Sequence, residues 1–154
     1  MFKYAVLAVP LAFAAVPSSA QSVGADPQRI AALMQAGGHA ADLTKDPTGD
    51  PAISSKAGPS QYWVLFYNCT DHQNCKTIEF HASYAMKDKP QLTLVNAWNA
   101  KSRFGRAYTD DVGDPVLQMD VDLDRGGMSP GLFNDNLDVW LSLLAKFEQH
   151  IGWR

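Results

Sequence analysis

The chain has 154 residues, of which 46% are hydrophobic and 19% charged, and its formal net charge at pH 7 is −3. This composition is ordinary for one globular domain and excludes an intrinsically disordered chain. The slight excess of acidic residues disfavours nucleic acid and anionic membrane surfaces as partners.

Residues 1–20 have the pattern of a secretory signal peptide. Lys3 supplies a positive charge, an apolar stretch covers residues 5–16, and Ser18 and Ala20 place small side chains just before a cleavage point. The apolar stretch is shorter than the roughly 20 residues that a membrane-spanning helix requires. We therefore expect cleavage near Ala20, a periplasmic or secreted location, and no stable membrane insertion.

One domain should occupy residues 21–154, starting with a short loose lead and a helix. Asp26 is typical of a helix N-cap, Pro27 of the first helical position, and Gly37 of the residue after the helix. Apolar residues recur at helical spacing between them. We expect a helix of about ten residues.

Four strands should follow, over residues 40–45, 51–56, 61–68 and 77–84, separated by turn-forming residues. The third holds an unbroken apolar and aromatic run, which predicts a central strand covered on both faces. The fourth alternates between apolar and polar residues, which predicts a strand with one exposed face.

The second half of the chain predicts a helix, two strands and a long helix. The helix should begin at residues 87–90, the strands should cover 106–110 and 116–123, and Ser129 should cap an amphipathic helix of about twenty residues. Short turns require antiparallel neighbours. The expected fold is therefore α+β, with a single antiparallel twisted sheet and three helices packed on it.

Cys69 and Cys75 lie in the loop between the third and fourth strands, and in an exported protein two cysteines so placed are expected to form a disulfide. Closing this short loop should stabilise the fold by roughly 2 kcal/mol. The alternative is a metal site that adds His72 and His81, but the spacing does not match a standard zinc pattern. We expect the disulfide, no metal and no cofactor.

Acidic residues between Asp110 and Asp124 are the other candidates for chemistry. Those near Asp110 suit turns, and those from Asp120 onward suit the exposed face of a strand, since the calcium-loop glycine and glutamate are missing. No nucleophile, phosphate-binding or metalloprotease motif is present in the sequence. We expect no enzymatic activity; the alternative is an enzyme or small-ligand binder that uses these carboxylates with His81.

The helix expected after residue 90 carries two amides, Asn96 and Asn99, beside Trp98. Burying an amide without a partner is unfavourable, so we expect each to bond strand-end or loop backbone. The alternative is a recognition groove. Together with Arg103 and Arg106 of the neighbouring basic run, these residues form a candidate interaction surface.

The order of several segments resembles the YbjN domain proteins, a family labelled as bacterial sensory transduction regulators. The resemblance covers about residues 26–151. Its main segments are DPTGDP (46–51), FYNC (66–69) with Cys75, VNAWN (95–99), RFGRAY (103–108) and the closing stretch 140–147.

The resemblance implies a fold like that of type III secretion chaperones, no known enzymatic activity and no known cofactor. A chaperone-like shape suggests a protein or peptide partner, and a homodimer is an option. We expect an exported, non-catalytic interaction or regulatory module, which the leader distinguishes from the cytoplasmic members.

Overall fold

The computed structural model describes residues 22–153, so the predicted signal peptide at residues 1–20 lies outside the described residues. The helices and strands follow in the order α1 (Pro27–Ala36), β1 (Asp42–Lys45), β2 (Pro51–Ala57), β3 (Ser60–Tyr67), β4 (Thr77–Ser83), α2 (Leu92–Lys101), β5 (Arg106–Thr109), β6 (Pro115–Asp122) and α3 (Pro130–Ile151).

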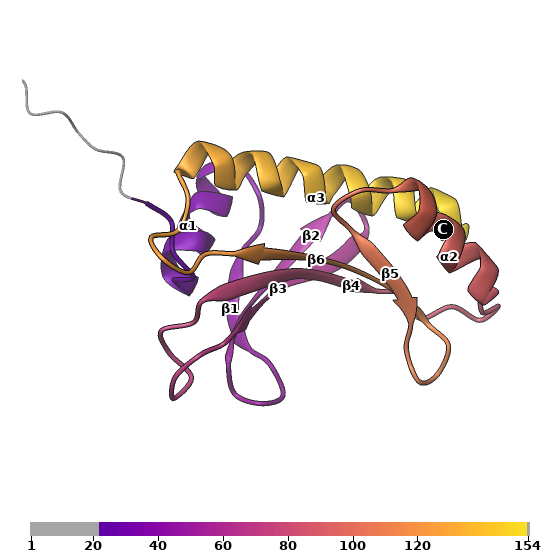
Figure 1. Ribbon diagram of the computed structural model, residues 1–154, viewed down its shortest axis with the longest axis horizontal. Helices are drawn as coiled ribbons and strands as arrows, with labels where there is room; N and C mark the ends of the chain where they lie inside the picture. The colour runs from indigo at the N-terminus through magenta and orange to yellow at the C-terminus, as the bar shows by residue number, and fades with distance from the viewer. Residues whose placement is uncertain (1–21, 154) are drawn as a thin grey trace, which may run out of the picture.

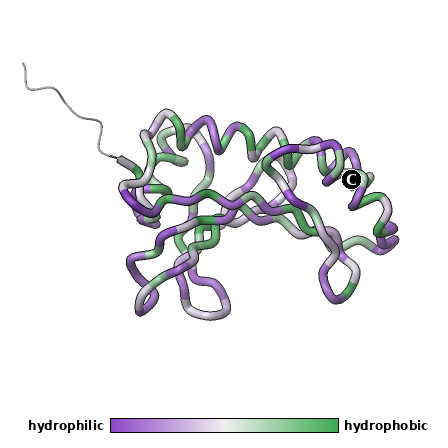
Figure 2. Tube along the Cα trace, viewed as in Figure 1, coloured by the Kyte–Doolittle hydropathy of each residue, from purple (hydrophilic) through white to green (hydrophobic). Residues whose placement is uncertain are grey.

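The strands form one antiparallel sheet in the order β1-β2-β3-β4-β6-β5, which confirms the predicted α+β class. All three helices lie on one side of the sheet: α3 runs along it, with α1 near one end and α2 near the other (Figure 1). Hydrophobic and hydrophilic residues alternate along α3 and the strands (Figure 2). The opposite side of the sheet, the open face, carries no helix of residues 22–153.

Aromatic residues dominate the core between the helices and the sheet. Trp140 of α3 is fully buried and stacks on Phe80 of β4, with ring centroids 5.6 Å apart. It also forms a T-shaped pair with Tyr62 of β3, with ring centroids 5.9 Å apart. At the α2 end, Phe147 packs against both Trp98 and Tyr84. Burial of such large side chains is the main stabilising contribution to the fold.

The helices α1 and α3 begin where the sequence predicts, whereas α2 does not. The Asp26 carboxylate accepts a hydrogen bond from the Arg29 N–H, and the Ser129 hydroxyl accepts one from the Leu132 N–H. The second helix, α2, begins only at Leu92. The preceding segment is held on the β5–β6 turn instead, because Asp114 accepts hydrogen bonds from the Met86 N–H and the Lys89 ammonium.

The lead before α1 is not loose, contrary to the sequence prediction. Val23 is buried and pairs with Met128, since each residue's N–H donates to the other's carbonyl oxygen at 2.7 and 3.0 Å. This pairing requires glycine at position 127, where φ is +66° and a Cβ atom would lie 2.1 Å from the Val23 oxygen. The lead is therefore a fixed part of the domain.

The prediction that the third strand is covered on both faces is wrong. Tyr62, Val64 and Phe66 are buried under the helices, but the alternate residues of β3 point to the open face and are half-buried or exposed. Among residues 22–153, no helix combines the length and apolarity needed to cross a membrane.

Candidate functional site

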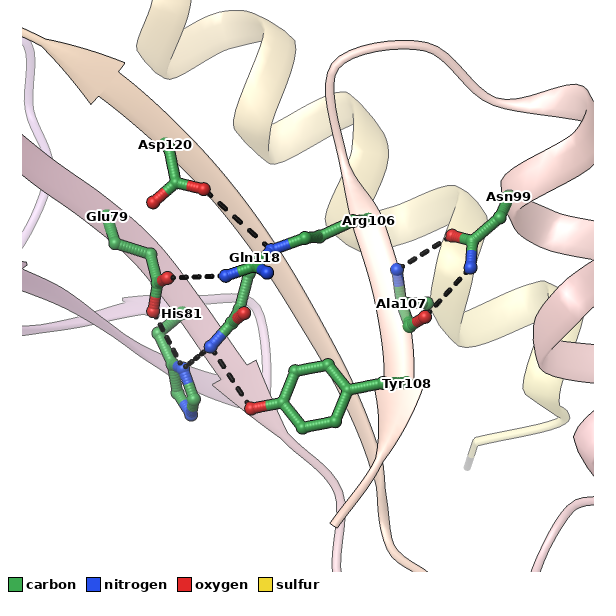
Figure 3. Close-up of polar contacts among 8 residues, drawn as sticks. All are labelled: Glu79, His81, Asn99, Arg106, Ala107, Tyr108, Gln118 and Asp120. Carbon is green, nitrogen blue, oxygen red and sulfur yellow. Dashed lines mark hydrogen bonds and ion pairs between the residues drawn. The ribbon is translucent and has the colours of Figure 1, made fainter.

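A polar cluster lies on the open face, on three adjacent strands. We call it the open-face cluster; its members are Glu79 and His81 of β4, Gln118 and Asp120 of β6, and Arg106 and Tyr108 of β5 (Figure 3). The register places Glu79 opposite Asp120, His81 opposite Gln118, and Gln118 opposite Arg106. Alternation along each strand then directs all six side chains to one face.

Glu79 is the most buried charged residue of the cluster, with 3% of its surface exposed. One carboxylate oxygen lies 3.3 Å from the Arg106 Nη2 atom, and the other lies 3.3 Å from the His81 Nδ1 atom. Arg106 also approaches Asp120, with its Nε atom 3.8 Å from a carboxylate oxygen. A buried carboxylate requires such partners, since desolvation without them is very unfavourable.

Gln118 joins the other side of the cluster. Its Nε2 amide donates to the Tyr108 hydroxyl at 3.1 Å and faces the His81 Nδ1 atom at 3.1 Å. Nδ1 therefore accepts from Gln118 in one tautomer and donates to Glu79 in the other. The Gln118 carbonyl oxygen is buried and has no hydrogen-bond partner among the described residues.

An open hollow of about 620 Å³ lies over the cluster. Its lining residues are Tyr67, Asn68, Thr77, Glu79, Arg106, Tyr108, Gln118 and Asp120. The hollow lies on strands from both halves of the sequence, since β4 pairs with β6 although α2 and β5 lie between them in the chain. It therefore exists only in the folded sheet.

Carboxylate charges act on the titratable groups of the hollow. Desolvation, together with the charges of Glu79, Asp46 and Asp120, raises the pKa of Tyr67 to about 12. Desolvation and the neighbouring charge of Glu79 also raise the pKa of Asp120, although Arg106 opposes that rise. In both groups burial is the largest cause of the shift, and the neighbouring carboxylate charges add to it.

Comparison with known families gives a match to the YbjN model, described as "Putative bacterial sensory transduction regulator", over residues 26–153. The chain belongs to the YbjN family. No curated protein and no solved structure matches it. The family description concerns regulation rather than catalysis; the expected likeness to type III secretion chaperones stays a prediction from the family resemblance.

The predicted interaction surface of this YbjN chain is not assembled as one site. Trp98 is buried against α3, and Asn99 bonds the main chain of β5. Asn96 is exposed and makes no side-chain hydrogen bond among the described residues, so the expectation that both amides bond backbone is wrong for Asn96. Arg103 is exposed and stacks over the Phe104 ring at 4.9 Å, and only Arg106 lines the hollow.

The two cysteines of the YbjN chain, Cys69 and Cys75, are joined in a disulfide in the structure, within the β3–β4 loop. The alternative ligand set is not gathered there: His72 contacts Asp50 at 2.7 Å, while His81 belongs to the open-face cluster. Among residues 22–153, no group of three or more His, Cys, Asp or Glu side chains is placed to hold a metal ion.

The candidate carboxylates between Asp110 and Asp124 are divided among different tasks. Asp110 accepts bonds from the N–H groups of Val112 and Asp114 and so closes the β5–β6 turn. Asp114 holds the segment before α2. Of this set, Asp120 is the residue that lines the hollow.

Sequence reasoning did not single out Glu79, Gln118 or Tyr108 as site residues. Each occupies a polar or exposed position in an alternating strand, which reads as a solvated surface. The signal that a polar residue on such a face is buried comes from the strand beside it, and that pairing is not visible in the sequence.

Proposed function

We propose that this chain is an exported, non-catalytic regulatory protein that acts by binding a segment of a protein partner on the open face of its sheet. The observation that carries the proposal is that this face has no helix over it among residues 22–153, yet holds a connected cluster around a buried carboxylate. The regulatory description of the family supports it.

The side chains around the cluster are of the types that protein interfaces favour. Trp63 and Leu65 of β3 are partly exposed on the open face, and Tyr67 and Tyr108 are more exposed. Tyr, Trp and Arg are enriched where proteins recognise proteins, because they combine a large apolar body with a polar end. A partner segment would cover these side chains and the hollow between them.

The hollow favours binding over reaction. Its carboxylates already have contacts with Arg106, and His81 contacts Glu79 and Gln118 through the same Nδ1 atom. Of the carboxylates in the alternative enzyme hypothesis only Asp120 lines the hollow, and His81 is not among the lining residues. A binding surface accounts for this arrangement, and it requires no side chain that reacts.

Export is supported by one feature of the sequence and one of the structure. Residues 1–20 have the charge, apolar stretch and small residues of a cleavable leader. The Cys69–Cys75 disulfide suits an oxidising compartment, because cytosolic thiols are kept reduced. Regulation by this chain would then depend on a partner that is itself outside the cytoplasm.

Site-specific photo-crosslinking in producing cells tests the binding face. A benzophenone amino acid is placed at Tyr67 or Tyr108 on the open face, and at Leu132, an exposed position on α3, as a control. We expect the same partner protein to be captured from both open-face positions and not from Leu132. Capture from Leu132 alone, or from none of the positions, would contradict the proposal.

A further inference from the structure

We infer that Glu79 and Asp120 form a recognition site for a basic side chain, a guanidinium or an ammonium, and that Arg106 is a displaceable internal cation in that site. The inference rests on the proposed function, because the basic side chain would belong to the bound partner segment. It adds the chemical class of the group recognised and the residues that recognise it.

Two carboxylates share this site with a single weakly held arginine. Arg106 reaches Glu79 through one nitrogen at 3.3 Å and Asp120 through another at 3.8 Å, so neither contact is the bidentate pair that holds arginine firmly. The Arg106 side chain is 62% exposed, and exposed ion pairs contribute little to stability. A second cation could therefore take its place at small cost.

The Gln118 carbonyl oxygen provides an independent indication of a missing donor. Gln118 is only 7% exposed and lines the hollow, and this oxygen has no hydrogen-bond partner among the described residues. In Figure 3 its carboxamide lies between the side chains of Arg106 and Tyr108. A buried acceptor without a donor is unfavourable, and the N–H groups of a bound cation would satisfy it.

The surroundings favour a cation over an anion. Tyr67 and Tyr108 line the hollow, and aromatic rings attract cations through their electron-rich faces. Burial raises the pKa of Tyr67, and the negative potential of Glu79, Asp46 and Asp120 raises it further. An anionic group would meet the same potential as repulsion, with Arg106 as its attractive partner in the hollow.

Binding of short blocked peptides distinguishes a site for a cation from a site for an anion. The probes are acetyl-Gly-Arg-Gly-amide, its neutral citrulline analogue and its glutamate analogue. Each is titrated into the purified protein, in the form in which the producing cell releases it, and binding is followed by NMR of the side-chain amides. We expect the arginine probe to shift the Gln118 amide signals, the citrulline probe to bind at least about tenfold more weakly, and the glutamate probe not to bind.

Substitutions with opposite expected effects on binding make the test specific. Arg106→Gln removes the internal cation and should tighten binding of the arginine probe by about threefold or more. Glu79→Gln should weaken it by at least about tenfold, and Asp120→Asn, at a side chain that is 64% exposed and so safe for folding, by about threefold. Arg103→Gln and Asp138→Asn change the net charge equally outside the hollow and should leave binding unchanged.

The result that overturns the inference is weaker or unchanged binding in Arg106→Gln, binding of the glutamate probe in place of the arginine probe, or no loss in Asp120→Asn. If no peptide binds but the open-face crosslinks still capture a partner, the basic-group inference fails and the proposed function stands. If the peptide binds but no open-face crosslink forms, the proposed function fails instead.

Discussion

Asn99 joins α2 to the edge strand β5 through both groups of its amide. Its Oδ1 atom accepts from the Ala107 N–H at 2.8 Å, and its Nδ2 atom donates to the Ala107 carbonyl at 2.9 Å. Ala107 is buried, so Asn99→Ala would leave two main-chain groups without partners. We expect a loss of about 1–3 kcal/mol in the free energy of unfolding, measured by urea denaturation.

Asn96 provides the matched control, three positions earlier on the same helix. It is exposed and makes no side-chain hydrogen bond among the described residues. Asn96→Ala should therefore change the free energy of unfolding by less than about 0.5 kcal/mol. Equal effects of the two substitutions would mean that the main-chain bonds of Asn99 contribute nothing.

Individual side-chain roles were only partly predictable from the sequence. The energetic argument that an amide on α2 should bond backbone is confirmed for Asn99 and wrong for Asn96, because the rotation of a ten-residue helix decides which amide meets β5. The burial of Glu79 and Gln118 depends on neighbours from other strands. Such pairings are set by the sheet as a whole.

At the scale of elements, the β3–β4 hairpin is fixed by its covalent cross-link. Replacing Cys69 and Cys75 together with serine should lower the free energy of unfolding by roughly 2 kcal/mol, because the unfolded chain regains the freedom of the open loop. Urea denaturation with and without a thiol reductant measures the effect. The reductant should destabilise the original protein and leave the serine variant unchanged.

Thiol titration provides the complementary measurement on the hairpin. The oxidised protein, unfolded in denaturant, should show no reactive thiol if Cys69 and Cys75 are paired. Two reactive thiols would contradict the pairing and reopen the thiolate-ligand alternative. A reductant that leaves the urea midpoint unchanged would also contradict the assigned stabilisation.

The β5–β6 turn and the segment before α2 are connected by a carboxylate that responds to pH. The hydrogen bond from Lys89, with that from the Met86 N–H, holds the pKa of Asp114 below its usual range. A lowered folded-state pKa stabilises the fold above the unfolded value of about 3.9, and this contribution disappears as pH falls through the folded pKa. Asp114→Asn should therefore lower the melting temperature at pH 7, and the difference from the original protein should shrink as the pH falls below about 4 and on through the folded-state pKa.

Asp111 in the same turn is the control for this pH effect. It is exposed, and no side-chain hydrogen bond of Asp111 is found within residues 22–153. At each pH between 7 and 3, Asp111→Asn should have almost the same melting temperature as the original protein. A difference between Asp114→Asn and the original protein that does not shrink as the pH falls below about 4 would show that the charge of Asp114 is not the cause.

Elements were predictable where one physical signal determines them. Capping residues located the starts of α1 and α3, and alternation located β4 and β6. The aromatic run of β3 was misread, because a face that carries Trp63, Leu65 and Tyr67 without a covering helix has the same composition as a buried one. The late start of α2 depends on Asp114, which lies far along the chain.

At the scale of the whole molecule, the number and order of helices and strands were predictable, and the sheet order was not. Short turns imply antiparallel pairs, which accounts for β1 to β4 and for β5 with β6. The pairing of β4 with β6 joins strands that α2 and β5 separate in the chain, and it brings Glu79 beside Asp120. This single non-local pairing creates the hollow, which explains why the site could not be assembled from sequence alone.

The predicted export concerns the chain as a whole and can be checked by mass. Produced in a Gram-negative bacterium, the protein should be recovered from the periplasm with Gln21 as its first residue, because Ser18 and Ala20 fit the small pockets of a signal peptidase. Ala20→Leu should block cleavage and leave a precursor that retains residues 1–20, whereas Ala15→Leu keeps the apolar stretch and should not. Intact-mass measurement of each fraction distinguishes the forms. Recovery of the original chain uncleaved in the cytosol would remove export from the proposed function and leave the open-face binding site to be tested against cytosolic partners.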